Sequence, residues 1–89
     1  MLHVKFKSVY QGQEDYEVEG PGIPDGQTRL RYDHTTGQWT GFMMGDPVFE
    51  TILGAVKEFV KNENRAAVEF FRGRDLKVPA VLFDDPRLR

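Results

Sequence analysis

Hydrophobic and polar residues alternate in the first part of the chain, residues 2–9. Leu2, Val4 and Phe6 occupy one set of alternate positions, and the positions between them are basic. The basic set comprises His3, Lys5 and Lys7. Because successive side chains of a β-strand point to opposite faces, this period of two predicts a half-buried strand.

A second alternating run, residues 15–19, predicts a partner for this strand. Gly12 lies midway between the two runs, at the centre of a hairpin loop over residues 11–13. A register centred on Gly12 brings three pairs of residues opposite one another: Lys7 and Glu17, Lys5 and Glu19, and Phe6 and Val18. Apolar side chains then meet on one face, and lysine meets carboxylate on the other.

Two more strands, residues 29–33 and 38–44, follow the Gly- and Pro-rich loop 20–27. The connection 34–37 suits a type I turn with Gly37 in the left-handed conformation. In a register with a three-residue loop, one face carries Leu30, Tyr32, Thr40, Phe42 and Met44. The other face carries Arg29, Arg31, Asp33, Trp39 and Met43. We expect the first face in the core, because burying unpaired arginines is costly.

A helix is predicted to begin at Asp46, which can cap free backbone amides, with Pro47 at its first position. Apolar residues then recur at steps of three and four, which is typical of a helix with one buried face. They are Val48, Phe49, Ile52, Leu53, Val56, Phe59 and Val60. This helix should lie on the sheet and end near Asn62 to Asn64, because asparagine tolerates a left-handed helix cap.

The last third of the chain has two interpretations. Residues 66–72 fit either a short helix or a strand, and their Phe and Val content favours the strand. Residues 76–83 would then form its partner, confined to an edge by Pro79. The tail 84–89 carries no packing pattern and is expected to fray. The predicted fold is α+β: an antiparallel sheet of N-terminal hairpins, one amphipathic helix packed on it, and a C-terminal hairpin or short helix.

Composition narrows the class of protein. Eighty-nine residues with 39% hydrophobic content predict one folded domain, residues 1–89. A net charge of -2 gives no overall basic field to attract nucleic acid or membranes. The absence of cysteine excludes disulfides and thiolate chemistry. No apolar run approaches the length of a membrane span and the first residues do not resemble a signal peptide, so we expect a cytoplasmic protein without a membrane partner.

A row of carboxylates is the first candidate surface. Asp15, Glu17 and Glu19 alternate on one face of the second strand, where they could mimic a phosphate backbone or hold a cation. Neutralisation by the basic residues of the first strand, His3, Lys5 and Lys7, is the favoured interpretation. A flat strand spreads its carboxylates too far apart for a calcium site, so no metal is predicted.

Trp39 with Arg29, Arg31 and Met43 is the second candidate surface. Tryptophan beside arginine is typical of protein-binding hot spots and of platforms on which bases stack. Alternatively, the C-terminal segment crosses this face and buries Trp39 in the core. A third, basic set comprises Arg65, Arg72, Arg74 and Lys77, which could bind phosphate but is more typical of a solvated surface.

Catalysis has little support in the sequence. Ser8 is the single serine, and it lacks the strand-turn-helix context of an activated nucleophile. His34 adjoins Asp33, but neighbouring side chains of an extended segment diverge, so they do not form a His-Asp pair. Neither an enzyme activity nor a cofactor is predicted. A small-ligand or metal site at loop 20–27 is a weaker alternative.

These observations predict a small cytosolic protein-interaction module without enzymatic activity. It would act as an inhibitor, adaptor or accessory subunit and bind a protein partner through one face of the sheet. Small accessory proteins of phages and mobile elements often share this size and this lack of catalytic groups, which is an analogy of class. The alternative function is single-stranded nucleic-acid binding through Trp39 and the neighbouring arginines. Homo-oligomerisation stays open, because a strand edge near Pro79 or an exposed Phe70 and Phe71 could pair with a second copy.

Overall fold

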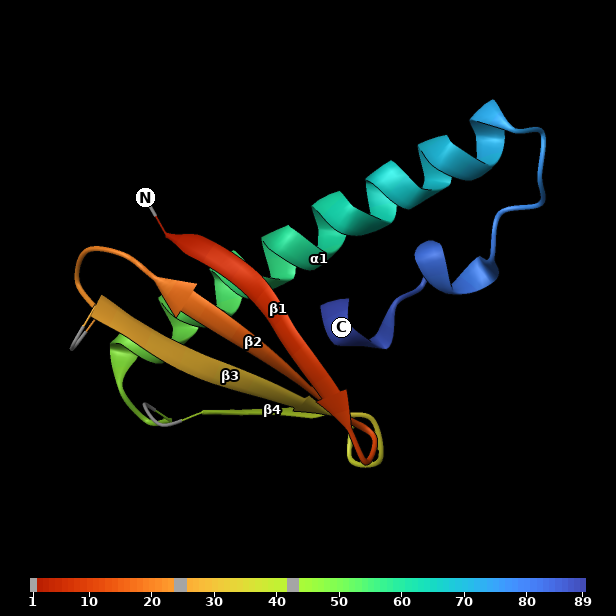
Figure 1. The fold of residues 1–89 in the computed structure, drawn as a ribbon. Helices are drawn as coiled ribbons and strands as arrows, with labels where there is room; N and C mark the ends of the chain where they lie inside the picture. The colour runs from red at the N-terminus through yellow and green to blue at the C-terminus, as the bar shows by residue number, and fades with distance from the viewer. Residues whose placement is uncertain (1, 24–25, 42–43) are drawn as a thin grey trace. The chain divides into compact units, whose positions relative to one another are not determined.

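The computed structural model describes residues 2–23, 26–41 and 44–89 and has α+β architecture (Figure 1). Four antiparallel strands in the order β1-β2-β3-β4 precede one long helix, α1, and two short 3-10 turns. The bounds of these elements are β1 His3–Tyr10, β2 Gln13–Glu19, β3 Gln27–Asp33, β4 Gln38–Gly41, α1 Pro47–Gly73, and turns at Ala80–Leu82 and Pro86–Leu88. The predicted fold class is confirmed.

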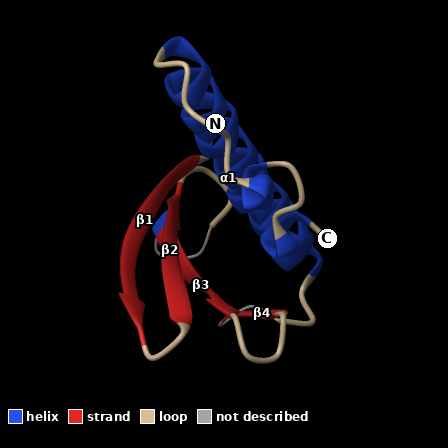
Figure 2. Ribbon diagram, turned by 90° about the vertical axis from the view of Figure 1, so that its right-hand side faces the viewer, coloured by secondary structure: helices blue, strands red, loops and turns tan. Residues whose placement is uncertain are grey.

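The chain forms two compact units, Met1–Val56 and Lys57–Arg89, and the boundary between them falls within α1. All four described strands, drawn as red ribbons in Figure 2, fall within residues 1–56 and so belong to the first unit. The described part of the second unit consists of helix, 3-10 turns and irregular segments. No described helix combines the length and apolar character needed to cross a membrane.

The first hairpin closes through a tight two-residue turn. Gln11 and Gly12 both have positive φ angles, of 51° and 76°, which is typical of the type I′ turns that match strand twist. Tyr10 therefore pairs with Gln13, and Lys5 lies opposite Glu17. The predicted pairing of Lys5 with Glu19 is wrong by two residues. Because a shift of two preserves the alternation, the predicted faces remain correct.

A β-bulge at Lys7 keeps the apolar residues of β1 on one face. Phe6 pairs with Tyr16, but the next pair along is Ser8 with Asp15. The extra residue shifts the alternation, so that Val9 joins Phe6 on the apolar face instead of facing the opposite way. This bulge was not predicted from the sequence.

The second hairpin has a four-residue loop, in contrast to the predicted three-residue loop. Asp33 pairs with Gln38, so Trp39 lies opposite Tyr32 and Thr40 lies opposite Arg31. Trp39 and Thr40 have therefore exchanged faces relative to the prediction, because a shift of one residue reverses every side chain of a strand.

The predicted course of this last strand beyond β4 also differs from the structure. β4 ends at Gly41, and Met44, expected in the core, is 57% exposed. Phe42 and Met43 lie outside the described residues.

The two faces of the sheet differ sharply in chemistry. The inner face carries Val4, Phe6, Val9, Glu14, Tyr16, Val18, Leu30, Tyr32, Trp39 and Gly41. The outer face carries His3, Lys5, Ser8, Tyr10, Gln13, Asp15, Glu17, Glu19, Gln27, Arg29, Arg31, Asp33, Gln38 and Thr40. Among the buried residues of the strands, Glu17 lies on the outer face and the others lie on the inner face, namely Glu14, Tyr16, Val18, Leu30 and Tyr32. The start of α1 packs against this inner face. The ring of Phe49 lies so close to Gly41 that a side chain at position 41 would have its Cβ atom only 3.2 Å from it.

Helix α1 begins as predicted but extends much further. The Asp46 carboxylate accepts a hydrogen bond of 2.9 Å from the Val48 amide, which satisfies one of the free donors at the helix start. The predicted apolar stripe is at least half-buried throughout. The predicted end at Asn62 to Asn64 and the strand favoured for 66–72 are both wrong, because the helix continues to Gly73. Two alanines, Ala66 and Ala67, and the absence of Gly and Pro between Asn64 and Gly73 favour this continuation.

The helix ends in a Schellman motif. Asp75 has a φ of 58°, its amide donates to the carbonyl of Arg72, and the Leu76 amide donates to the carbonyl of Phe71. Residues 76–83, predicted to form a strand, are irregular apart from the 3-10 turn at Ala80–Leu82.

A buried carboxylate connects the C-terminal tail to α1 within the second unit. Asp85 is 5% exposed and accepts hydrogen bonds from the side chains of Asn64, at 2.9 Å, and Arg87, at 2.5 Å. Burial works to raise the pKa of Asp85, but these hydrogen bonds outweigh it and lower the pKa to about 2. The sequence predicted a tail over residues 84–89 without packing contacts.

Candidate functional site

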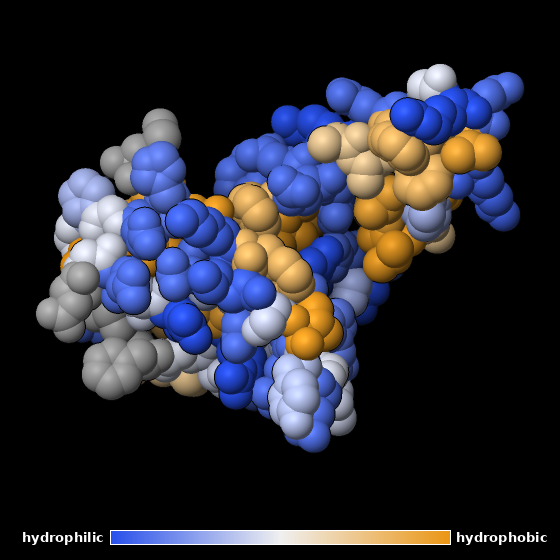
Figure 3. Space-filling view, viewed as in Figure 1, coloured by the Kyte–Doolittle hydropathy of each residue, from blue (hydrophilic) through white to orange (hydrophobic). Residues whose placement is uncertain are grey.

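The outer face of the sheet combines residues that the sequence assigned to two different surfaces. On β2, Asp15, Glu17 and Glu19 point outward in alternation. Arg31 of β3 lies directly opposite Asp15, and Arg29 lies opposite Glu17. Because the strands are adjacent and antiparallel, the acidic row and the predicted arginines form one surface of interleaved charges. The space-filling view shows hydrophilic side chains gathered over β2 and β3 (Figure 3).

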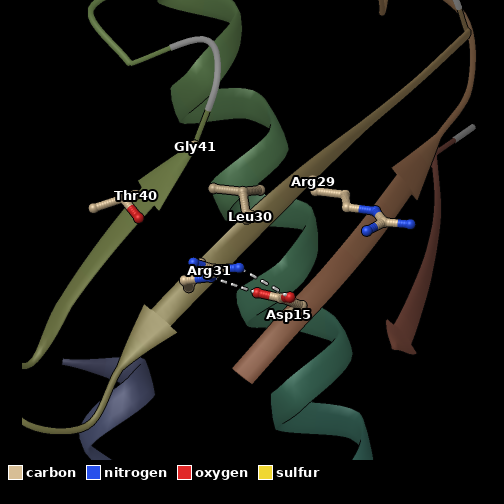
Figure 4. A pocket seen from close by; sticks show the side chains of 6 residues that line it. All are labelled: Asp15, Arg29, Leu30, Arg31, Thr40 and Gly41. Carbon is tan, nitrogen blue, oxygen red and sulfur yellow. Dashed lines mark hydrogen bonds and ion pairs between the residues drawn. The ribbon is translucent and has the colours of Figure 1, made fainter. Parts of the chain in front are cut away.

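Asp15 and Arg31 form the tightest contact of this surface. The Nε and Nη2 atoms of Arg31 donate to the two carboxylate oxygens of Asp15 at 2.7 and 3.3 Å (Figure 4). This two-point geometry suits the planar guanidinium group. The hydrogen bond to Asp15, followed by the attraction of its charge, raises the pKa of Arg31. Arg31 therefore stays a cation that is aligned by its partner.

Glu17 is shared more loosely by two cations. Its carboxylate lies 3.8 Å from Nη2 of Arg29 and 4.0 Å from Nζ of Lys7. The Glu17 side chain is nearly buried, whereas that of Arg29 is 64% exposed. Arg29 is therefore the more accessible of the two arginines for a second partner.

Asp15 and Glu17 of the acidic row are neutralised, but largely by residues other than the predicted ones. Arg29 and Arg31 supply the described contacts to Glu17 and Asp15, and from β1 Lys7 alone contributes an ion pair. Within the described residues, neither His3 nor Lys5 lies within 4.0 Å of a carboxylate oxygen. The sequence could not choose between β1 and β3 as the source of positive charge, because β2 pairs with both.

A shallow hollow of about 310 Å³ opens beside the arginines. Its walls are formed by Asp15, Arg29, Leu30, Arg31, Thr40 and Gly41 (Figure 4). Thr40 is short and Gly41 has no side chain, so β4 leaves space next to the long arginine side chains of β3. A side chain of a binding partner could enter this hollow.

Trp39 does not belong to the charged surface. It lies on the inner face, where its ring centroid is 5.0 Å from that of Tyr32 and 5.6 Å from that of Tyr16. The side chain is half-buried in this aromatic cluster. The predicted grouping of Trp39 with Arg29 and Arg31 on one face is therefore wrong, and the position of Met43 lies outside the described residues.

A second polar cluster lies on the inner face, and the sequence analysis did not predict it. Glu14 is nearly buried and lies 2.5 Å from Nε2 of His34, and it also accepts a hydrogen bond of 3.4 Å from the Tyr16 hydroxyl. The ring of Tyr32 packs edge-on against His34. The signal was available, because Glu14 is in phase with the apolar positions of β2, Tyr16 and Val18.

The Glu14–His34 pair supplies one carboxylate and one imidazole. Among the described residues, no group of three or more potential ligands could hold a metal ion. Ser8 lies on the other face, opposite Asp15. The pair is held by a short contact between Glu14 and His34, and Ser8 of β1, on the other face, does not reach it.

The remaining predicted features occupy separate places. Part of loop 20–27 borders an apolar hollow of about 380 Å³, while Pro24 and Asp25 lie outside the described residues. In the second unit, the guanidinium carbon of Arg74 lies 3.9 Å from the ring centre of Phe70, and that of Arg72 lies 6.0 Å from the ring centre of Phe83. These two arginines cover aromatic rings of their own unit.

Comparison with protein-family models, curated proteins and solved structures finds no match for this chain. Its function is therefore inferred from its own residues and their geometry.

Proposed function

We propose that this protein is a small cytoplasmic interaction module without enzymatic activity, an inhibitor, adaptor or accessory subunit, that binds a protein partner through the outer face of its sheet. The observation that supports this proposal is the pairing of Arg29 and Arg31 with Glu17 and Asp15 around an open hollow. The surface offers both signs of charge at fixed strand spacings. Such an array can select a partner by charge complementarity and orientation.

Arg29 is the residue that we expect to contribute most to partner binding. Its exposed guanidinium group contacts Glu17 at 3.8 Å, a loose contact that a carboxylate of the partner could replace or share. Arginine is enriched among the residues that dominate binding energy at protein interfaces. Arg31, held by Asp15, would help to orient the same acidic side chain at the hollow.

A protein partner fits this surface better than single-stranded nucleic acid. Stacking of bases would require Trp39 beside the arginines, but these side chains lie on opposite faces of the sheet. Both arginines also face carboxylates at close range, which repel phosphates. The geometry gives the base-stacking alternative no support.

Affinity capture from host lysate, with and without nuclease, tests the proposal. We expect the unaltered chain to retain one protein in stoichiometric amount after nuclease treatment. The amount of this protein captured by the variant Arg29→Ala should be lower by a factor of about ten or more. This factor corresponds to a loss of about 1.4 kcal/mol in binding free energy, which is typical of a hot-spot residue. Arg65→Ala, an exposed arginine of the second unit, serves as the matched control and should bind normally.

Circular dichroism of both variants would confirm that the fold is retained. Capture that disappears with nuclease would refute the proposal in favour of nucleic-acid binding. Equal capture by Arg29→Ala and the unaltered chain would remove the outer face from the interface.

A further inference from the structure

Strand β1 forms one edge of the sheet. In the described sheet, β2 is its one neighbour, and all eight residues of β1 are exposed except Val4, which is half-buried. An edge strand presents a row of backbone amides and carbonyls that can pair with another extended chain. Figure 3 shows apolar atoms at the surface along this side of the sheet, next to the hydrophilic outer face.

The charge of this edge is of one sign. β1 contains His3, Lys5 and Lys7 and no acidic residue. Glu17, which lies opposite Lys5, is already engaged by Arg29 and Lys7. In the described part of the chain, His3 and Lys5 therefore lack a carboxylate within ion-pair distance. They remain available to carboxylates outside the present sheet.

The apolar side of the same edge is incompletely covered. Phe6 packs edge-on against Tyr16 with ring centroids 5.5 Å apart, yet 47% of Phe6 is exposed. Val9 is 60% exposed. Side chains of an added strand at alternate positions would cover Phe6, which lies in the regular stretch of β1 before the bulge, because strands lie about 4.8 Å apart in a sheet.

Strand β2 shows which sequence pattern pairs with β1. It places Glu17 opposite Lys5 on the outer face, and Val18 opposite Val4 on the inner face. A strand on the other edge of β1 would meet the same alternation of basic and apolar side chains, because residue faces are common to both edges. Its complement is an extended segment that alternates acidic and apolar residues.

We propose that the edge of β1 binds such an acidic, alternating segment of a protein partner as a fifth strand of the sheet. His3 and Lys5 face the acidic residues of the segment, and Val4 and Phe6 face its apolar residues. Addition of a strand at a sheet edge is an established mode of peptide recognition, in which main-chain hydrogen bonds supply affinity and side chains supply specificity.

A second copy of the chain is the wrong occupant for this edge. Pairing β1 with another β1 would place histidine and lysines against one another, and like charges on neighbouring strands are destabilising. The bulge at Lys7 further limits regular pairing to the stretch before it, residues 3–6. The repulsion between basic residues and the bulge therefore argue against pairing of β1 with a second β1. The same positive charge attracts an acidic strand.

The inference goes beyond the proposed function, because it uses the backbone of β1 rather than the hollow beside Arg29. The two claims can therefore fail separately. Arg29→Ala should leave strand addition at β1 intact, and a change at Lys5 should alter it.

Nuclear magnetic resonance titration of the full chain with two synthetic peptides tests this inference. The first probe, Glu-Val-Glu-Tyr-Glu-Val-Glu, should shift the backbone amide signals of β1 and slow the hydrogen exchange of those amides that point away from β2. The second probe, with lysine in place of each glutamate, should not. In the variant Lys5→Glu, affinity for the acidic probe should fall about fivefold or more, as loss of a cross-strand ion pair and its replacement by repulsion imply.

Several results would overturn the inference. Equal binding of the two peptides would show that charge does not select the occupant, and an absence of shifts at millimolar peptide would show that the edge does not accept a strand. Protection without peptide of the outward-pointing β1 amides, those not bonded to β2, would assign the edge to the chain itself if it is independent of protein concentration. It would assign the edge to a second copy if it increases with concentration.

Discussion

Asp33 closes the second hairpin with its side chain as well as its backbone. Its carboxylate accepts hydrogen bonds from the amides of Thr35, at 2.8 Å, and Thr36, at 3.4 Å, while its carbonyl accepts one from Gly37. The Thr35 amide is the main cause of the lowered pKa of Asp33. This local network fixes a four-residue loop and, through it, the face on which Trp39 lies.

Asp85 provides a residue-scale prediction about pH. Its pKa is lowered from 3.8 to about 2, so the ionised form is favoured in the folded chain. The stabilisation it provides is complete above about pH 4 and is lost as the pH falls through about 2. We expect Asp85→Asn to reduce the free energy of unfolding at pH 6 by about 1 to 2 kcal/mol and to flatten its decline between pH 4 and 2.

Urea denaturation at a series of pH values measures this effect. The neighbouring Asp84→Asn is the control, because Asp84 is 75% exposed in its contact with Arg89. Identical pH profiles for Asp85→Asn and the unaltered chain would show that Asp85 is not the group responsible.

At the element scale, the alternation of residues predicted the strands and their faces but not the register of each hairpin. In the first hairpin, a register shifted by two residues leaves every side chain on the same face. The alternation of residues therefore cannot distinguish the predicted register from the observed one. In the second, a one-residue change in loop length depends on hydrogen bonds of Asp33 that no periodicity reveals. The prediction that Arg29 and Arg31 share a face was therefore correct, whereas the addition of Trp39 to it was not.

The length of α1 was underestimated for a different reason. Asn64 was expected to cap the helix, but its amide group donates instead to the buried carboxylate of Asp85, which lies far along the sequence. The actual end is fixed by Asp75, a residue type that tolerates the left-handed conformation less well than glycine. Tertiary contacts of this kind are not visible in a local pattern.

The Schellman motif of α1 therefore gives an element-scale prediction. Asp75→Gly should raise the free energy of unfolding by about 0.5 kcal/mol, because glycine adopts a φ of 58° without steric cost. Asp75→Ala should lower it, since alanine lacks both this freedom and a polar side chain that supports the turn. Thermal denaturation of the three proteins measures the order, and equal stability of the Ala and Gly variants would contradict the role of the left-handed conformation.

At the scale of the whole molecule, the first unit separates its apolar and charged surfaces onto opposite faces of one sheet. The inner face forms the core with the start of α1, and the outer face keeps its charges in pairs beside an open hollow. A surface with paired charges costs little stability while unoccupied and retains directional groups for a partner. The β1 edge adds a second, positively charged surface to the same sheet.

An exchange of charges on the outer face tests the central claim most directly. The double variant Asp15→Arg with Arg31→Asp keeps the cross-strand ion pair, and with it the fold, but reverses the charge at each position beside the hollow. If the outer face binds the partner, the double variant should have an unchanged melting temperature and should retain at least about tenfold less captured partner than the unaltered chain. Full capture by a folded double variant would contradict the claim that this face is the binding surface.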